Sequence, residues 1–307
     1  MPVVSIAHTN DLSNEGVKKA TFDAIEKSGF KLPDQLKTVI LKLNLRYYWD
    51  FSTGETTDPR VVSAIIDYIR NHYNHKVEII IAEADASAMR TKYAFRMLGY
   101  EELANKKAVR LINLSECKKV EKKVIVKDNK FNLQIAQSML DCDLLINVPK
   151  LRTHRLTTIS CGMKNLFGAI TKPRKIVYHS NLDKAIVGMN KLVRCHLTIV
   201  DGIISLGKYP LNLGTILVSE DQLAADFVAA RIMGYNPWKI RHLKLAHEEG
   251  VGSGEEIHIE GIRDMEKLKS FPKENYMLFN LSWRIQLLLL NSYLKMTGDT
   301  RPPVLDM

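Results

Sequence analysis

Along this chain, short apolar runs alternate with longer segments whose apolar positions recur at helical spacing. A continuous apolar run such as 77–82 is typical of a strand buried on both faces. A segment such as 58–71 is typical of a helix with one buried face, and Pro59 suits its first turn. The alternation predicts an α/β fold with a mostly parallel open sheet and helices on both faces. Further strands are predicted at 3–7, 39–43, 109–114, 120–126, 144–148, 197–200 and 216–219, and further helices at 16–27, 93–104, 221–233 and from Pro237.

The chain shows no repeat, no low-complexity tract and no clear linker. We therefore expect residues 1–262 to form a single α/β domain, with two lobes at about 1–142 and 143–262 as the alternative. A helical C-terminal extension is predicted over 263–307. Its apolar segment 279–296 is interrupted by polar residues, so it is too polar for a membrane span. We interpret this segment as a core helix or as the surface of a homo-oligomer.

Lysine and arginine exceed aspartate and glutamate by 44 to 34, a net charge of +10. That excess favours anionic partners, whether small molecules, nucleic acid or a membrane surface. The lysine-rich part, 106–123, is interpreted as a solvated face. The four cysteines are far apart and form no CxxC pair, which argues against an iron–sulfur cluster or a zinc site held by this chain alone. With no signal-peptide pattern at the start, we expect a cytoplasmic protein.

One long basic stretch directs attention to a possible site. Between Asp143 and Asp183 there is no acidic residue. The stretch follows the predicted strand 144–148, and open α/β folds bind ligands at the carboxyl ends of their strands. We therefore predict a site for something anionic. Its cations and histidines are Lys150, Arg152, His154, Arg155, Lys164, Lys172, Arg174, Lys175 and His179.

Lys150, Arg152 and His154 are spaced two residues apart, so in extended backbone their side chains lie on one side. Two cations and an imidazole on one side suit a phosphate or a carboxylate. The alternative is that these side chains pair with acids on neighbouring helices. We favour the ligand because the flanking sequence offers no acid.

Lys164 follows His154 by ten residues and comes just after Gly162. A lysine held near other cations has a lowered pKa, which suits Schiff-base or covalent chemistry. A simple contact to an anion is the alternative. Amide groups near Asn165 could add to an anion site, and Gly162 could let a ligand approach closely. His179 is a candidate general acid or base, so we take His154, Lys164 and His179 as candidate catalytic residues.

Other predicted strands also end in polar side chains, and parallel strands share one carboxyl edge. Lys42 and Asn44 leave the second strand, and Thr57 precedes the next helix, so all three are candidate ligand contacts. Three carboxylates follow other strands. They could bind a metal, act as a general base or neutralise the basic stretch. These carboxylates are Glu83, Asp85 and Asp201.

Several motifs in order resemble the family known as the domain of unknown function 362. They include ILKLNLR from 40, TTDPRVVSAIIDYIR from 56, NVPKLRTH from 147, GMKNLFG from 162 and SEDQLAADFVAARIMGYNP from 219. Some members carry ferredoxin-type cysteine motifs, but this chain does not, so the resemblance carries no cluster over. The His154–Gly162–Lys164 spacing is also similar to nickel-dependent lactate racemases, in which the lysine holds a pincer cofactor. Met163 replaces a second glycine of that pattern, and a following proline–glycine is missing.

These observations favour an enzyme or a cofactor- or ligand-binding protein that holds an anionic small molecule in a basic pocket. The cofactor is not identified by the sequence. A nucleic-acid-binding module is the first alternative, although only Phe167 and Tyr178 supply aromatic rings to the basic stretch. An accessory protein of an iron–sulfur or redox system and a lactate-racemase-like enzyme are the others.

Overall fold

The structure, a computed structural model, describes residues 1–73, 76–261 and 271–273, with positions 285, 288, 289, 292, 293 and 296. The helical extension predicted over 263–307 therefore lies outside the described residues apart from those few positions. The proposed homo-oligomer surface over 279–296 lies outside them in the same way.

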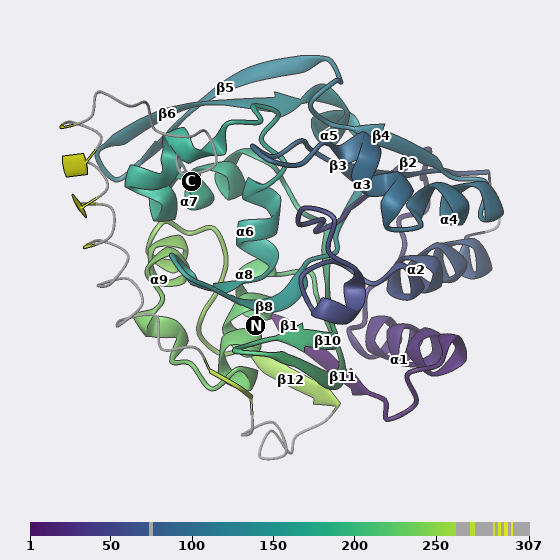
Figure 1. The fold of residues 1–307 in the computed structure, drawn as a ribbon. Helices are drawn as coiled ribbons and strands as arrows, with labels where there is room; N and C mark the ends of the chain where they lie inside the picture. The colour runs from purple at the N-terminus through teal and green to yellow at the C-terminus, as the bar shows by residue number, and fades with distance from the viewer. Residues whose placement is uncertain are drawn as a thin grey trace.

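A mixed, mostly parallel sheet forms the centre of the molecule, as the sequence predicts (Figure 1). Its strand order is β12-β1-β11-β10-β7-β2-β3-β4, and β8 joins it through β10 and carries β9. The middle strands run parallel, whereas β11 lies antiparallel between β1 and β10. The strands of this sheet are β1 (Val3–His8), β2 (Thr38–Lys42), β3 (Glu78–Glu83), β4 (Arg110–Asn113), β7 (Leu144–Asn147), β8 (Lys150–His154), β9 (Thr158–Ser160), β10 (Leu197–Leu206), β11 (Pro210–Ser219) and β12 (His258–Gly261).

Helices cover both faces of the sheet, which makes the middle strands apolar on both sides. Alternate residues of one strand enter different core clusters: Val39 and Leu41 of β2 pack with α1 and α2, and Ile40 packs with α6 to α9. In Figure 1, α1, α2 and α4 lie to the right of the sheet and α6, α7 and α9 to the left. The helices are α1 (Asn14–Lys27), α2 (Pro59–His72), α3 (Thr91–Met97), α4 (Tyr100–Lys106), α5 (Gln137–Asp141), α6 (Gly162–Phe167), α7 (Leu182–Leu192), α8 (Gln222–Ile232) and α9 (Arg241–Glu248).

Shorter elements complete the described fold. A separate two-stranded hairpin, β5 (Lys119–Val126) with β6 (Asn129–Ala136), packs its buried side on α7. Three short 3₁₀ helices connect other elements: η1 (Phe51–Thr53), η2 (Lys175–Asn181) and η3 (Pro237–Lys239).

Local sequence explains most element boundaries. Asp58 and Asp221 cap α2 and α8, each accepting a hydrogen bond from a backbone N–H in the first turn. The helix predicted over 93–104 is two helices, because Gly99 lies between them with φ of 76°, in the left-handed region. The stretch from Lys150 forms strand β8, where an extended loop is predicted.

Strand β7 lies where the two alternative lobes, at about 1–142 and 143–262, would meet. It pairs with β2 from the first half of the chain and with β10 from the second. Because β7 is hydrogen-bonded on both sides, the polar side chains that follow β2, β3 and β7 lie along one edge of one sheet. The candidate site is assembled on this edge.

Candidate functional site

Lys150 and Asp201 of the candidate site form a fully buried ion pair. The Lys150 Nζ lies 2.8 Å from Asp201 Oδ2, and both side chains are 0% exposed. Asp201 also accepts hydrogen bonds from the backbone N–H groups of Asp58, at 2.7 Å, and Ile203, at 3.0 Å. Burial raises the pKa of Asp201, while Lys150 acts in the opposite direction. The ammonium of Lys150 is thus engaged inside the protein.

Lys42 and Asn165 meet at the carboxyl edge, together with Glu83. The Lys42 Nζ lies 2.7 Å from Glu83 Oε1 and donates to the Leu43 carbonyl at 2.6 Å. It also lies 3.4 Å from Asn165 Oδ1. Burial lowers the pKa of Lys42, and Glu83 opposes the shift. We call Lys42, Glu83, Asn147 and Asn165 the strand-end network, since Asn165 Nδ2 also donates to Asn147 Oδ1 at 2.7 Å.

Asn44 and Thr57 brace the loop between β2 and α2. The Thr57 hydroxyl accepts from the Asn44 backbone N–H at 2.9 Å and donates to the Val148 carbonyl at 2.9 Å. The Asn44 side chain donates to the Glu55 carbonyl at 2.7 Å. Both side chains therefore hold the loop that carries Arg46 and Glu55 against the end of β7.

The three candidate metal-binding carboxylates lie apart in separate interactions. Glu83 pairs with Lys42 and Asp201 with Lys150. Asp85 accepts from the Thr91 backbone N–H at 2.8 Å, from Asn113 Nδ2 at 3.1 Å and from Arg90. Among the described residues, no group of three or more His, Cys, Asp or Glu side chains is arranged to hold a metal ion.

Gly162 begins α6 where α8 leaves no room for a side chain. A Cβ at this position would lie 2.8 Å from Gln222 Cγ and 2.9 Å from Asp226 Oδ1. The Asp226 carboxylate accepts from the backbone N–H groups of Gly162, at 2.7 Å, and Met163, at 3.0 Å. Burial raises the pKa of Asp226 to about 7 and keeps that of Cys161 well above its usual range. The first amides of α6 are thus used by Asp226.

Lys164 differs from Lys42 and Lys150, the two fully buried lysines of the site. It is partly buried, and within the described part of the chain it has no hydrogen bond and no ion pair. Burial lowers its pKa well below the ordinary value, and the charges of Arg152 and Arg46 lower it further. Glu55 opposes the shift. An amine in this environment loses its proton more readily than a surface lysine.

Two guanidinium groups whose charges act on Lys164 share one carboxylate. Glu55 Oε2 lies 3.3 Å from Arg46 Nη1 and 3.4 Å from Arg152 Nε. Arg152 is 4% exposed. The charges of these two guanidinium groups and of Glu55 all act on Lys164. We call Arg46, Glu55, Arg152, His154, Lys164 and His179 the Lys164 cluster.

His154 is fixed by the hairpin between β8 and β9. Its Nδ1 accepts from the Leu156 backbone N–H at 3.3 Å and lies 3.0 Å from the Thr157 hydroxyl. An amide can only donate, so the neutral imidazole carries its proton on Nε2. Thr158 closes this hairpin with φ of 67°, an uncommon conformation for a β-branched residue. Burial and the charge of Lys164 lower the pKa of His154 well below its usual value.

His179 lies near Lys164 from η2, on the segment that leads into α7. Partial burial lowers its pKa, as do the charges of Lys164 and Arg155, although the residue is exposed at the surface. On the same segment, Lys175 donates to the Asp85 carbonyl, and burial lowers its pKa to about 8. The structure thus places His154, Lys164, His179 and Arg152 together, beside the strand-end network.

His242 was not predicted from the sequence, yet it belongs to this neighbourhood. It lies on α9 with 0% exposure, and neither ring nitrogen has a hydrogen-bond partner. Asp183 lies close to it, with Oδ1 4.0 Å from Nδ1. Burial lowers the pKa of His242 to about 3, and the charge of Lys164 adds to this. A histidine among the apolar positions 243 and 246 of an amphipathic helix is the signal that could have identified it.

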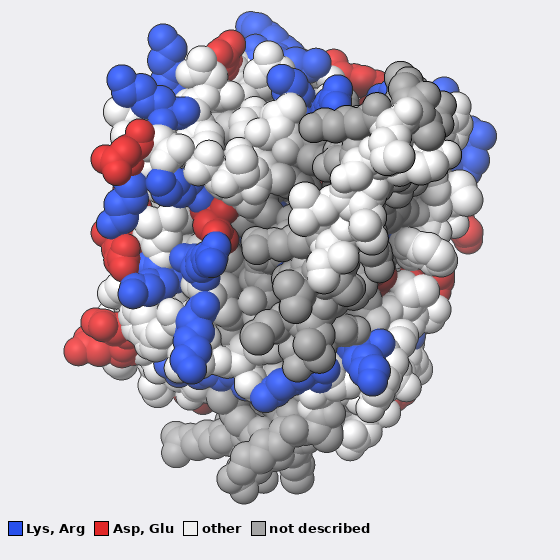
Figure 2. All heavy atoms as spheres, turned by 60° about the vertical axis from the view of Figure 1, so that its left-hand side comes forward, with Lys and Arg blue, Asp and Glu red and all other residues white. Residues whose placement is uncertain are grey.

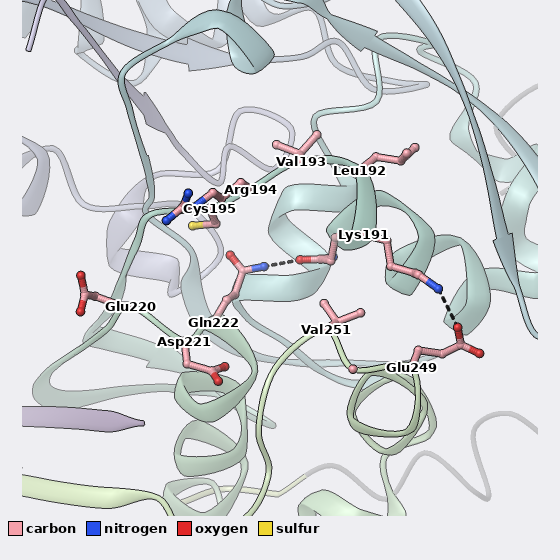
Figure 3. A pocket seen from close by; sticks show the side chains of 12 residues that line it. Lys191, Leu192, Val193, Arg194, Cys195, Glu220, Asp221, Gln222, Glu249 and Val251 are labelled. Atoms are coloured by element: carbon pink, nitrogen blue, oxygen red, sulfur yellow. Dashed lines mark hydrogen bonds and ion pairs between the residues drawn. The ribbon is translucent and has the colours of Figure 1, made fainter. Parts of the chain in front are cut away.

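A hollow of 560 Å³ lies at the opposite, amino-terminal side of β10 (Figure 3). Positively and negatively charged side chains both line it, and Lys191 Nζ lies 2.8 Å from Glu249 Oε2 there. The site residues predicted from the sequence do not line it. A chain of amides joins its wall to the strand-end network, because Gln222 hydrogen-bonds to Asn190 and also accepts from Asn147 at 2.6 Å.

Surface charge is mixed on the face shown in Figure 2. Positive side chains alternate with negative ones along its left-hand side and do not form one continuous basic strip. Separately, none of the helices that the structure describes is both long and apolar enough to cross a membrane.

Comparison with known proteins adds a family and two similar chains. The sequence profile of the family described as "Domain of unknown function (DUF362)" matches residues 39–231. The thylakoid-associated protein sll1697 of Synechocystis sp. is 30% identical over 119 residues, which cover 34% of this chain and 37% of that protein. The chain thus matches little more than a third of that relative's length. A crystal structure of a Thermotoga maritima protein from the Northeast Structural Genomics Consortium gives a TM-score of 0.38 at 12% identity, covering 63% of this chain and 51% of that one.

Proposed function

The chain belongs to the DUF362 family, whose description assigns no activity, and from that premise we propose that it binds a small anionic molecule at the Lys164 cluster. The ligand is a metabolite or cofactor with a carboxylate or phosphate group.

One observation carries the proposal. Lys164 is a partly buried lysine without a hydrogen bond or ion pair in the described residues, next to two arginines that share one carboxylate. A lysine amine that no group of the described chain engages is available to an anion, and the charges of Arg152 and Arg46 act at the same place. An anion bound here would supply the missing partner. Arginine favours planar, bidentate recognition of carboxylate or phosphate.

Calorimetric titration with inorganic phosphate at neutral pH tests the proposal. We expect saturable binding by the wild-type protein and an affinity reduced roughly tenfold to a hundredfold in Lys164→Met, since a charge-assisted hydrogen bond is worth about 1.5–3 kcal/mol. Lys172→Met is the matched control, because Lys172 is an exposed lysine of the same basic stretch. Equal loss of affinity in both variants would contradict a specific site, and so would the absence of binding by the wild type.

The nucleic-acid alternative is separated by the same variants. The charges on the one face drawn in Figure 2 are mixed, so that face does not offer an extended basic surface for nucleic acid. If transfer RNA binds with a steep salt dependence that Lys164→Met and Lys172→Met weaken alike, the nucleic-acid hypothesis is favoured.

We retain a reducing, cytoplasmic location as a proposal, supported by four free cysteines.

A further inference from the structure

The β5–β6 hairpin packs one face on the protein and turns the other outward. Its inner face lies against α7 at Gly188, where an added Cβ would lie 3.0 Å from Val124 Cγ1. In Figure 1 the hairpin runs along the top of the molecule, above α7. Side chains alternate across a strand, and residues paired across two strands share a face. The outer positions are therefore 119, 121, 123 and 125 on β5 and 130, 132 and 134 on β6.

This outer face is cationic. Lys119, Lys123 and Lys130 lie on it and are exposed, and Glu121 is the single acid among its positions. Within the part of the chain that the structure describes, none of the three lysines has an ion pair or a side-chain hydrogen bond. Ile125 pairs across the strands with Lys130 and is 56% exposed. The face thus combines unengaged ammonium groups with an apolar side chain.

A neighbouring segment, 171–178, continues this face beyond the edge of β6. The Thr171 backbone N–H and the Tyr178 hydroxyl donate to two carbonyls of β6, at 3.0 and 3.4 Å. The segment contains no acid, Lys172 in it is exposed, and Val177 is 49% exposed. We call the outer face of the hairpin together with segment 171–178 the hairpin surface.

The shape of the hairpin surface favours a flat anionic partner over a nucleic-acid groove. A free two-stranded ribbon can enter the major groove of DNA, but here segment 171–178 flanks β6, so the ribbon does not stand free. Ile125 and Val177 are aliphatic, so they give a base no ring on which to stack. Lysine is a flexible point charge that suits phosphate groups in many positions. Aliphatic side chains between lysines suit the interfacial layer of a lipid bilayer.

We propose that the hairpin surface docks the protein on a bilayer that contains anionic phospholipids. The lysines contact the phosphates of the headgroups, and Ile125 and Val177 enter the layer between the headgroups. This inference does not rest on the proposed anion-binding function, because the hairpin surface includes neither Lys164 nor Arg152.

Cosedimentation with vesicles tests the proposal on the full chain. Vesicles of phosphatidylglycerol and phosphatidylcholine in equal parts are compared with vesicles of phosphatidylcholine alone. We expect the wild-type protein to bind the anionic vesicles and not the neutral ones, and added salt to weaken the binding. The absence of binding to anionic vesicles, or equal binding to both kinds, would overturn the proposal.

A triple variant shows whether this surface makes the contact. Replacing Lys119, Lys123 and Lys130 with glutamine should lower the vesicle partition coefficient roughly a hundredfold, since each lysine near an anionic surface contributes about fivefold, or about 1 kcal/mol. The matched control replaces three exposed lysines on or near α1 and α2, on the other side of the sheet, and should change the coefficient far less. The control residues are Lys19, Lys31 and Lys76. Equal losses in the two triple variants would show that net charge and not this surface binds. An unchanged urea midpoint excludes a damaged fold.

The apolar contact and the alternative partner have separate readouts. Ile125→Ser should weaken vesicle binding several-fold and leave its salt dependence unchanged, because the lysines remain. Tyr209→Ser is the control, since Tyr209 lies between β10 and β11 and is 58% exposed. Equal affinities of Ile125→Ser and the wild type would refute the interfacial contact.

Tighter binding of transfer RNA than of vesicles, lost in the same lysine variant, would overturn the bilayer in favour of nucleic acid. Lys164→Met should bind vesicles as the wild type does. Loss of phosphate binding with retained vesicle binding would therefore refute only the proposed function, and the reverse result would refute only this inference.

Discussion

Replacing Lys150 with methionine should unfold the protein more readily and should not act mainly on ligand binding. Lys150 Nζ lies 2.8 Å from Asp201 Oδ2, and both side chains are 0% exposed. Methionine keeps most of the side-chain length but leaves the Asp201 carboxylate buried with only two backbone N–H donors, from Asp58 and Ile203. An uncompensated charge would then remain in the core.

Breaking a buried ion pair from one side costs about 3–5 kcal/mol, a large fraction of the stability of a domain. Burial already raises the pKa of Asp201, and loss of Lys150 raises it further. The folded variant then binds a proton that the unfolded chain releases, so stability falls as pH rises. Urea unfolding followed by circular dichroism should therefore show a larger deficit for Lys150→Met at pH 8 than at pH 5.

An exposed ion pair provides the control. Lys27 Nζ lies 2.6 Å from Asp23 Oδ2 with both side chains about two-fifths exposed, and Lys27→Met should cost under about 1 kcal/mol. The double variant Lys150→Met with Asp201→Asn should lose less than the sum of its single variants, because neither charge is left behind. The reasoning is refuted if Lys150→Met costs no more than Lys27→Met, or if its deficit is the same at both pH values.

Three further predictions concern α6 and its neighbours. Because the pKa of Asp226 is about 7 in the fold and 3.8 is its ordinary value, this group costs up to about 4 kcal/mol of stability as pH rises from 4 to 7. Asp226→Asn should flatten that slope in urea titrations, and an unchanged slope would contradict the assignment. For His242 the sign is reversed: its pKa of about 3 means that stability falls by about 5 kcal/mol as pH drops from 6.5 to 3. His242→Phe should therefore resist acid better than the wild type, and equal acid midpoints would count against it. Gly162→Ala should cost about 1–3 kcal/mol, because its Cβ would meet Gln222 at 2.8 Å, and a thermal midpoint like that of the wild type would show that the helices can move apart.

The elements of the sheet could be predicted because their signals are local. The apolar run at 144–148 is buried on both faces and corresponds to β7 within one residue. The helix predicted over 58–71 corresponds to α2 with similar accuracy, since its capping residue Asp58 and Pro59 mark the start. Strands β8 and β9 were not predicted, because β8 pairs with β10 some fifty residues later, and such pairing has no local signal.

The candidate site, like the fold, has features that the sequence predicts and features that it does not. The absence of acid between Asp143 and Asp183 indicates a cationic neighbourhood, and the structure does gather Arg152, His154, Lys164 and His179. The sequence could not say which lysine keeps a free amine. The reasoning that no nearby acid pairs with the basic stretch fails for Lys150, whose partner lies 51 positions along the chain.

The sequence by itself therefore determined the α/β class, the family, the order of most elements and the charge of the site, because these depend on periodicity and on runs of neighbouring residues. Only the tertiary structure decided that Lys42 and Lys150 are paired, that Asp226 takes the first amides of α6, and that His242 is buried with neither ring nitrogen hydrogen-bonded among the described residues. These outcomes depend on which residues the packed sheet and helices bring within a few ångströms. Burial then multiplies the effect of each contact, because the low-dielectric interior penalises every charge that lacks a partner.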